Sequence, residues 1–393
     1  MRIAFFADYL NHHQLPFCLA MDRLTGGQFT FVATTSVSEN RIKLGYQDMN
    51  KQYPFVLTTY DSDENQQQAM KLAKDCDVFI LGSAPKEYLQ ERLKYKKLSF
   101  VYSERLYKSG YEAWKWPVRL IKQYKAYGRH RNLYLLCAGA FTAADFAKTG
   151  TFVHKAYQWG YFPQFKRQEV NALLAQKAED KQISMLWVGR LIPWKRPEDA
   201  LALAEKLKVN GYAFRLDMVG TGDMDTQLQT IITQKGLSNH VHLMGAMTPE
   251  QVRERMEKAD IYLFTSDRNE GWGAVLNESM NSGCAVVASH AIGAVPFLLN
   301  DGQNGLVYRG GDGDDLYAKV KYLMDHPDER RRLGEKAYLT LENAWNAESA
   351  AQRLLLLAQD LMEHKRSTRF ADGPCSPAKN VKDTWYETKK SVF

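Results

Sequence analysis

Two glutamates and two cations follow apolar runs in the second half of the chain, and their types suit a charged, hydroxyl-rich ligand. Glu270 stands just before a helix that opens near Gly273, and Glu278 stands about two turns inside it. Arg190 and Lys195 lie in the loop after the first apolar run of that half. Carboxylates accept hydrogen bonds from sugar or ribose hydroxyls well, because the acceptor is charged. Two fixed cations can hold a diphosphate and neutralise the charge that develops on it as a leaving group.

Each of these features has an ordinary structural interpretation when taken alone. Two glutamates eight residues apart on a helix are usually solvated, and cations at a strand exit are usually surface residues. The segment 220–223 nearly matches the pattern GxGxxG, but Asp225 stands in place of the third glycine, so it is weak support for a dinucleotide site. The segment 241–247 offers backbone groups at another strand end, suitable for a nucleobase edge.

The chain contains twelve short apolar runs, and most of them are followed by a helical pattern. The elements that these runs form must hold the candidate side chains in place. The runs are 3–7, 29–34, 55–60, 78–81, 98–103 and 133–138, then 184–189, 214–219, 241–244, 261–266, 285–289 and 306–308. Such alternation predicts parallel sheets covered on both faces, and twelve strands exceed what one doubly wound sheet usually holds. We therefore expect an α/β protein with two Rossmann-like, doubly wound parallel-sheet domains.

Three parts are expected along the chain. Residues 160–163 break regular structure and residues 168–181 form a polar helical pattern, so a boundary is expected there. The interpretation is an N-terminal domain at 1–165, a C-terminal domain at 166–348, and a helix and tail at 349–393.

The order of these motifs resembles that of family 4 glycosyltransferases, which are retaining enzymes of the GT-B fold. The resemblance is close over residues 183–309 and extends to the full chain by architecture. It rests on Gly189-Arg190 with Lys195, Gly220-Thr221-Gly222, Met244-Gly245, Glu270-Gly271-Trp272-Gly273 with Glu278, and the segment 282–289.

The resemblance implies a role for each matching position. Arg190 and Lys195 would bind the donor diphosphate, Glu278 would hold the ribose, and Glu270 would contact the transferred sugar. The remaining donor-binding positions are expected at Gly189, Gly220, Gly222, Met244, Gly245, Gly271, Trp272, Gly273, Ala274 and Val275. The resemblance also implies that the two domains face each other across a cleft, with the acceptor in the N-terminal domain and the donor in the C-terminal domain. It further implies that the last helix and the tail return to the N-terminal domain, where Trp385 and Tyr386 would pack.

The first domain departs from the family pattern. After its first strand, where related enzymes often carry a glycine-rich loop, this chain has polar residues that include Asn11, His12 and His13. They could contact an acceptor, and a histidine could aid proton transfer because it titrates near neutrality; equally, Asn11 could cap a helix beside exposed histidines. Glu104 and Arg105 stand where many relatives have a histidine, and Glu104 could instead pair with Arg105 or Lys108.

Composition and charge limit the alternatives. The 393-residue chain has no run of 18 apolar residues and five scattered cysteines, which favours a cytosolic protein without a disulfide framework or zinc site. The net charge is +7, and the window 92–131 carries twelve basic residues, two acids and several aromatic residues. This window suits an anionic membrane surface, nucleic acid, or simply a solvated helix face. The three Asp-x-Asp pairs occur at the frequency expected by chance, so no metal site is predicted.

The leading hypothesis is a retaining, metal-independent hexosyltransferase that uses a nucleotide-diphosphate sugar and needs no other cofactor. Its acceptor would be a glycan or lipid-linked intermediate of bacterial surface polysaccharide synthesis, met at the inner membrane face, with no nucleic-acid partner. The alternatives are a sugar-nucleotide epimerase of the same fold and a non-catalytic nucleotide-sugar-binding protein. A NAD-linked oxidoreductase is the weakest alternative, because the glycine fingerprint is incomplete.

Overall fold

The protein, described here as a computed structural model, divides into two compact units. The structure describes residues 1–38, 48–106, 108, 116–178, 182–364 and 366–387. Unit 1 comprises Met1–Gln164 and Ala344–Lys382, and unit 2 comprises Phe165–Asn343 with the described residues from Asp383. Part of the predicted basic window and the end of the predicted helix at 168–181 lie outside the described residues.

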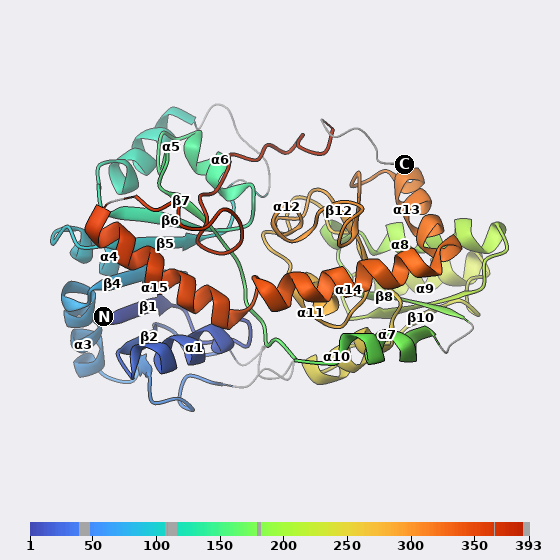
Figure 1. The fold of residues 1–393 in the computed structure, drawn as a ribbon, viewed down its shortest axis with the longest axis horizontal. Coiled ribbons are helices and arrows are strands. Elements are labelled where there is room, and N and C mark those ends of the chain that lie inside the picture. The colour runs from blue at the N-terminus through green and yellow to red at the C-terminus, as the bar shows by residue number, and fades with distance from the viewer. Residues whose placement is uncertain (39–47, 107, 109–115, 179–181, 365, 388–393) are drawn as a thin grey trace. The chain divides into compact units, whose positions relative to one another are not determined.

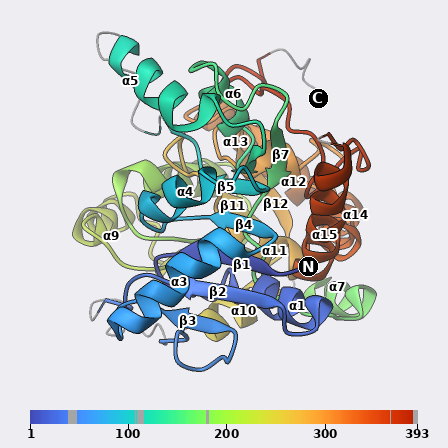
Figure 2. The ribbon, with the colours of Figure 1, turned by 90° about the vertical axis from the view of Figure 1, so that its left-hand side faces the viewer.

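Unit 1 is built on a parallel sheet with the strand order β3-β2-β1-β4-β5-β6-β7 (Figure 2). The strands are β1 (Ile3–Ala7), β2 (Phe29–Ala33), β3 (Val56–Thr58), β4 (Val78–Leu81), β5 (Ser99–Ser103), β6 (Leu133–Ala138) and β7 (Ala156–Trp159). All five residues of the central strand β1 are buried, because helices cover both faces of the sheet.

The helices of unit 1 connect these strands and include the last long helix of the chain. They are α1 (Leu15–Thr25), α3 (Asp63–Asp75), α4 (Lys86–Leu93), α5 (Trp116–Gln123), the π-helical turn η2 (Tyr124–Gly128), α6 (Thr142–Ala147) and α15 (Ala347–His364). Although α15 is distant in sequence, it packs on α1, and Arg23 forms an ion pair with Glu348 at this contact (Figure 1).

Unit 2 contains a parallel sheet with the strand order β10-β9-β8-β11-β12-β13. The strands are β8 (Ile183–Val188), β9 (Phe214–Val219), β10 (Val241–Leu243), β11 (Ile261–Phe264), β12 (Ala285–Ser289) and β13 (Leu306–Tyr308). The helices are α7 (Val170–Ala178), the 3₁₀ turn η3 (Pro193–Lys195), α8 (Pro197–Val209), α9 (Asp225–Gln234), α10 (Pro249–Lys258), α11 (Val275–Asn281), α12 (Val295–Leu298), α13 (Gly313–Asp325) and α14 (Pro327–Asn343).

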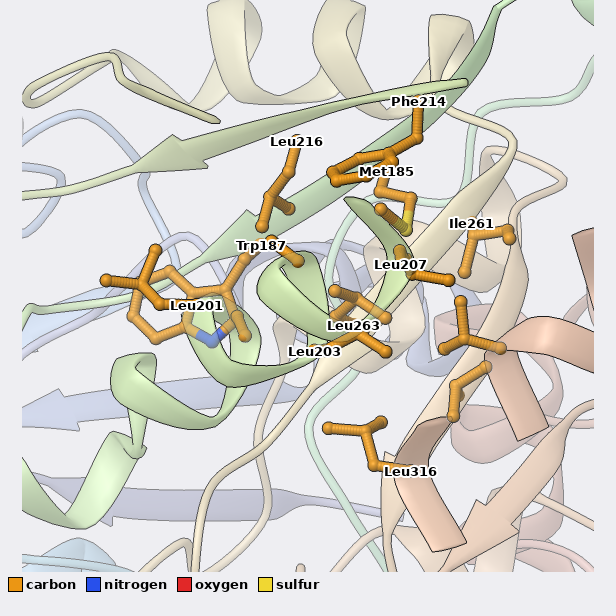
Figure 3. Packing of buried hydrophobic residues seen from close by; sticks show 14 of the residues in the cluster. Met185, Trp187, Leu201, Leu203, Leu207, Phe214, Leu216, Ile261, Leu263 and Leu316 are labelled. Carbon is orange, nitrogen blue, oxygen red and sulfur yellow. The ribbon is translucent and has the colours of Figure 1, made fainter. Parts of the chain in front are cut away.

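The core of unit 2 fills the space between its sheet and the helices on one face (Figure 3). Trp187 of β8 is among the largest fully buried side chains, and it packs with Leu201 of α8 and Leu263 of β11 in one cluster. This cluster anchors β8 and β11, whose ends carry the predicted cations and Glu270.

The two predicted parallel sheets are confirmed, and each of the twelve apolar runs overlaps a strand. The strand β7 was not predicted, because it has only four residues and Gln158 interrupts its apolar character. This edge strand is covered by the C-terminal segment, since Gln158 exchanges backbone hydrogen bonds with Cys375 and Ser376, each 2.8 Å long.

The C-terminal tail differs from the expectation. The segment 344–382 groups with unit 1, but the residues after it pack on unit 2. The indole nitrogen of Trp385 donates to the carbonyl of His290 over 3.1 Å, and the Tyr386 hydroxyl donates to the carbonyl of Val307 over 2.6 Å. The expected packing of these two aromatic residues on the first domain is therefore wrong, because unit 2 offers their polar atoms backbone acceptors.

Within the described ranges, no helix combines the length and apolar character required to cross a membrane.

Candidate active site

The loops that follow β8 and β11 are joined by hydrogen bonds that begin in the core of unit 2. The buried indole of Trp187 donates to the Thr265 hydroxyl over 2.8 Å, and that hydroxyl donates to the backbone carbonyl of Lys195 over 2.8 Å. The amide of Asp267 donates to the carbonyl of Trp194 over 2.9 Å. Lys195 is thus fixed through Thr265 to the sheet itself.

Lys195 and Glu270 form an ion pair at the carboxyl end of this sheet. Their side chains are only 12% and 11% exposed, and the Ser266 hydroxyl also donates to the Glu270 carboxylate over 3.0 Å. The Lys195 ammonium lies 4.7 Å from the centre of the Trp194 ring. A partly buried cation and anion are therefore held in one place by each other and by neighbouring groups.

Arg190 lies beside the same tryptophan. Its guanidinium carbon is 5.9 Å from the centre of the Trp194 ring, and the residue is exposed. Arg190 and Lys195 consequently share one aromatic neighbour at the end of β8, where two positive charges can act on one anionic ligand.

Glu278 of α11 and Glu270 both lie near enough to Tyr262 to affect its pKa. Burial raises the pKa of the Glu278 carboxyl to about 7, while the nearby Arg253 guanidinium opposes the rise. Burial also raises the pKa of the Tyr262 phenol, and the charges of Glu278 and Glu270 add to that rise. Both carboxylates therefore lie within electrostatic reach of Tyr262, whose hydroxyl donates to the carbonyl of Val188 over 3.5 Å.

The predicted glycine positions bring the ends of β8, β9 and β10 together. A Cβ atom at Gly220 would lie 1.9 Å from the carbonyl oxygen of Gly189, and one at Gly222 would lie 2.3 Å from that of Leu191. The Gly220 amide donates to the carbonyl of Gly245 over 2.8 Å, directly after Met244. At Gly220 and Gly222 the loops pack backbone against backbone, which leaves no room for a side chain.

The stretch from Gly271 to Val275 turns tightly before α11. Gly273 has a φ of 93°, and a Cβ atom there would lie 2.5 Å from the Phe264 ring. Trp272 is fully buried, and its indole nitrogen donates to Asn277 over 2.9 Å. The Trp272 side chain packs inside the turn, so only its backbone remains available for the expected contact with the donor. Ala274 is buried as well.

In unit 1, the predicted acceptor-side residues separate into two groups. The His13 ring is stacked on that of Tyr161, with centroids 6.0 Å apart, and the Tyr161 hydroxyl donates to Glu104 over 2.6 Å. Glu104 also forms an ion pair with Lys108, one of the two partners considered for it. These residues meet near the carboxyl ends of β1, β5 and β7, as parallel strands require.

Arg105 belongs to the second group. It is 5% exposed, and its guanidinium nitrogen lies 3.3 Å from the Asp145 carboxylate and against the Phe141 ring. We therefore assign Arg105 to the structure of unit 1, in place of the expected acceptor contact. The partner Asp145 is 40 residues away in sequence, which is why the pairing could not be predicted from Arg105 alone.

The loop after β1 is held by Asn11. Its side-chain oxygen accepts hydrogen bonds from the amides of His13 and Gln14, over 3.0 and 3.2 Å, at the start of α1. Burial and the adjacent His12 lower the pKa of His13 to about 3. His13 is therefore neutral near pH 7 and does not titrate near neutrality, contrary to the reasoning that suggested it for proton transfer.

Sequence reasoning assigned no role to Ser266, Tyr161 or Trp194. Ser266 is the last residue of the apolar run 261–266, two residues after β11 ends, and Tyr161 lies in the segment that was interpreted as a domain boundary. A signal was available for Tyr161, since an aromatic residue with a polar tip after a strand end can reach a neighbouring loop. Trp194 adjoins Lys195, and its neighbours became evident only from the fold.

The comparisons with known proteins agree with this fold. Residues 171–340 match the family model of glycosyl transferases group 1. The crystal structure of Anabaena Alr3699/HepE in complex with UDP has a TM-score of 0.69 and 16% identity, covering 92% of this chain and 100% of that chain. The crystal structure of TarM has a TM-score of 0.64 and 11% identity, and the match covers 91% of this chain and 98% of that chain. The chain has the GT-B fold, and its residues 171–340 are similar to the glycosyl transferases group 1 family.

Two curated relatives are more similar to this chain in sequence than the two crystal structures are. The putative colanic acid biosynthesis glycosyltransferase WcaL of Salmonella typhimurium is 27% identical over 192 residues, 47% of this chain and 47% of the relative. The amylovoran biosynthesis glycosyltransferase AmsK of Erwinia amylovora is 30% identical over 194 residues, which are 48% of this chain and 47% of the relative. The chain spans less than half the length of these relatives in the matched region.

Proposed function

We propose that the protein is a retaining glycosyltransferase that moves a hexose-type sugar from a nucleotide-diphosphate sugar to a glycan or lipid-linked acceptor. The donor binds to unit 2 and the acceptor to unit 1, and no metal ion is needed. The relatives named for colanic acid and amylovoran biosynthesis favour a role in bacterial surface polysaccharide synthesis. A lipid-linked acceptor would be met at the inner face of the membrane.

The observation that carries this proposal is the group formed by Lys195, Glu270 and Ser266, with Arg190 beside it on Trp194. It lies at the carboxyl end of a parallel sheet, which is where ligands of open α/β sheets bind. It also combines two cations, suited to a diphosphate, with a carboxylate suited to sugar hydroxyls.

The Lys195–Glu270 ion pair determines which contacts change when the donor binds. When the donor binds, its diphosphate takes the Lys195 ammonium as a partner, and Glu270 becomes available to accept hydrogen bonds from hydroxyls of the transferred sugar. Glu278 accepts from the ribose, as the family resemblance implies. The glycine-lined loops around Gly220 and Gly245 allow the nucleobase to approach the backbone.

The reaction breaks the bond between the anomeric carbon and the diphosphate oxygen. The acceptor oxygen then bonds to the anomeric carbon on the face that the diphosphate leaves, and the acceptor proton passes to the departing phosphate oxygen. Arg190 and Lys195 stabilise the negative charge on that leaving group, which is the main contribution of the enzyme to the rate. No side chain is required as a base.

On the acceptor side, the proposal uses His13, Tyr161 and Glu104. The Glu104 carboxylate and the Tyr161 hydroxyl can exchange hydrogen bonds with acceptor hydroxyls, and the two rings offer apolar faces to a sugar. Asn11 positions the loop, and His12 adjoins His13 with a centroid distance of 3.7 Å.

A transfer assay tests the proposal. A panel of nucleotide sugars is first screened by thermal shift, since a ligand that binds the folded state raises the melting temperature. The best ligand is then used as donor with Arg190→Ala, Lys195→Ala and Glu270→Ala, and with Lys258→Ala as a control at an exposed cation of unit 2. We expect large losses of transfer in the three site variants and none in the control.

The same assay separates the alternatives. Conversion of the donor alone to an isomeric nucleotide sugar would indicate an epimerase. Donor binding without turnover, over a full range of acceptors, would indicate a non-catalytic binding protein. Near-normal transfer in all three site variants would refute the assignment of the site.

A further inference from the structure

The helix α5 presents apolar side chains at the surface of unit 1. No residue of α5 is buried, and Val118, Leu120 and Ile121 are 71%, 37% and 53% exposed. Tyr124, one turn beyond in η2, is 45% exposed. Residues 120, 121 and 124 recur at the spacing of one helix face, so the exposed apolar groups form a continuous stripe. Large apolar side chains gathered in this way mark an interaction surface.

The same segment is strongly basic. Residues 116–131 contain five lysines and arginines and no acidic residue. Lys122 and Lys125 are exposed, as are Arg129 and Arg131. An apolar stripe beside these exposed cations is complementary to a surface that is negatively charged outside and apolar beneath.

A hollow of about 560 Å³ lies between this segment and α4. Lys122, Lys125 and His130 line it from one side. Lys86 of α4 and Lys94, directly after α4, line it from the other. Lys94 is paired with Glu91, so the positive charge that remains available comes mainly from the other three lysines. Lys86 also lies 5.9 Å from the Tyr127 ring centre, which holds it over the segment. Three ammonium groups around one hollow suit a phosphate group.

We propose that α5 and η2 form a docking face for a bilayer that contains anionic lipid. The stripe of Val118, Leu120, Ile121 and Tyr124 enters the boundary between headgroups and acyl chains, and the hollow against α4 receives a headgroup phosphate. The proposal deepens the one for a lipid-linked acceptor, because it brings unit 1 to the surface where such an acceptor lies. It concerns described residues only, and binding to lipid does not depend on the transfer reaction.

The exposed apolar stripe favours a bilayer over nucleic acid. Nucleic-acid-binding surfaces use cations with polar or stacking side chains to contact phosphates and bases. The aliphatic groups of Val118, Leu120 and Ile121 would gain nothing from a phosphate backbone, whereas the acyl boundary removes them from water.

Vesicle co-sedimentation of the full chain tests the proposal without any nucleotide sugar present. The probes are phosphatidylcholine vesicles with and without phosphatidylglycerol, at low and high salt. Leu120→Ser/Ile121→Ser removes the apolar stripe, and Lys122→Gln/Lys125→Gln removes charge from the hollow. Val209→Ser/Lys258→Gln is the matched control, because both residues are exposed and lie in unit 2. The altered side chains are exposed, so thermal melts should show that all three variants fold.

We expect the wild-type protein and the control to bind anionic vesicles at low salt, with binding weakened by salt. The Lys122→Gln/Lys125→Gln variant should show a partition coefficient at least about tenfold lower, given the usual contribution of two lysines near an anionic surface. The Leu120→Ser/Ile121→Ser variant should also lose at least about tenfold, because two large aliphatic side chains no longer leave water on binding. Equal binding by wild type and both test variants, or no preference for phosphatidylglycerol, would overturn the proposal. So would binding to an oligonucleotide without binding to vesicles. Because donor turnover in solution is measured separately, failure here leaves the proposed transfer reaction intact.

Discussion

Lys195 and Glu270 satisfy each other's charge while remaining close to the surface at which a donor would bind. A pair that is 12% and 11% exposed loses much of its hydration, so each charge depends on the other. Ser266 adds a hydrogen bond to Glu270, which holds the carboxylate when Lys195 turns to a ligand. Under the proposed function, the pair would hold the site in place and would exchange partners when a diphosphate binds.

This dependence leads to a prediction for Lys195→Ala. The variant should lose roughly 3 kcal/mol of unfolding free energy, because Glu270 keeps a poorly hydrated charge without a partner. Its kcat should fall by about 10²–10³-fold with the loss of leaving-group stabilisation. The double variant Lys195→Ala/Glu270→Gln should regain most of the stability and none of the activity, as measured by urea denaturation and the transfer assay. Recovery of activity in the double variant would contradict a role for Lys195 in the reaction.

Glu278 gives a prediction for pH. Since burial raises the pKa of Glu278 to about 7, the carboxyl is ionised above that pH and protonated below it. Only the ionised form accepts charge-assisted hydrogen bonds from a ribose, so a nucleotide sugar should bind about tenfold more weakly at pH 6 than at pH 8. Calorimetry on the wild type and on Glu278→Gln measures this, and the variant should bind weakly with little dependence on pH. The same pH dependence in both proteins would assign it to another group.

The sequence allowed the role of a residue to be predicted when that residue lies in the loop after a strand. Arg190, Lys195 and Glu270 were found in this way, since the carboxyl ends of parallel strands share one edge of a sheet. Burial could not be predicted: Arg105 is held inside by Asp145, and Trp272 by Asn277, through contacts that depend on the fold.

Among the elements, the loops after β8 and β9 are in direct backbone contact. Gly220 has a φ of 131°, and its α-carbon faces the carbonyl of Gly189 so closely that no side chain fits. The Leu191 amide donates to the carbonyl of Thr221 over 3.0 Å, next to this contact. The position of Arg190 is therefore set by how closely these two loops approach.

Gly220→Ala should disturb the site through this contact. The added Cβ atom would lie 1.9 Å from the Gly189 oxygen, so the loop must shift, and we expect a loss of at least roughly 3 kcal/mol in unfolding free energy together with weaker donor binding. Gly245→Ala is the matched control, because its φ of 70° is also positive but nothing lies within 4 Å of the new atom. It should cost only about 1–2 kcal/mol. Equal melting temperatures for the two variants would show that the close approach has no energetic consequence.

The strands could be predicted well, because buried parallel strands are nearly continuous apolar runs. The edge strand β7 was missed since its four residues include Gln158, whose backbone pairs with residues more than 200 positions later. The exposed face of α5 could be suspected from charge and aromatic content alone, but the hollow beside it arises from packing against α4.

At the scale of the whole molecule, the chain passes between the two units more often than the sequence suggested. The helix α15 returns to unit 1 and packs on α1, but Trp385 and Tyr386 bond to unit 2. The return of the helix was implied by the family resemblance. The destination of the tail was not, because an aromatic pair near a terminus carries no information about which surface offers it acceptors.

The central claim is that Arg190, Lys195, Glu270 and Glu278 surround one nucleotide sugar. The most direct measurement is a crystal structure of the full chain with the nucleotide sugar that gives the largest thermal shift. The account predicts the diphosphate within hydrogen-bonding distance of the Lys195 ammonium and the Arg190 guanidinium, with Glu270 on the sugar and Glu278 on the ribose hydroxyls. A nucleotide sugar bound away from the ends of β8 and β11, with the Lys195–Glu270 pair undisturbed, would contradict it.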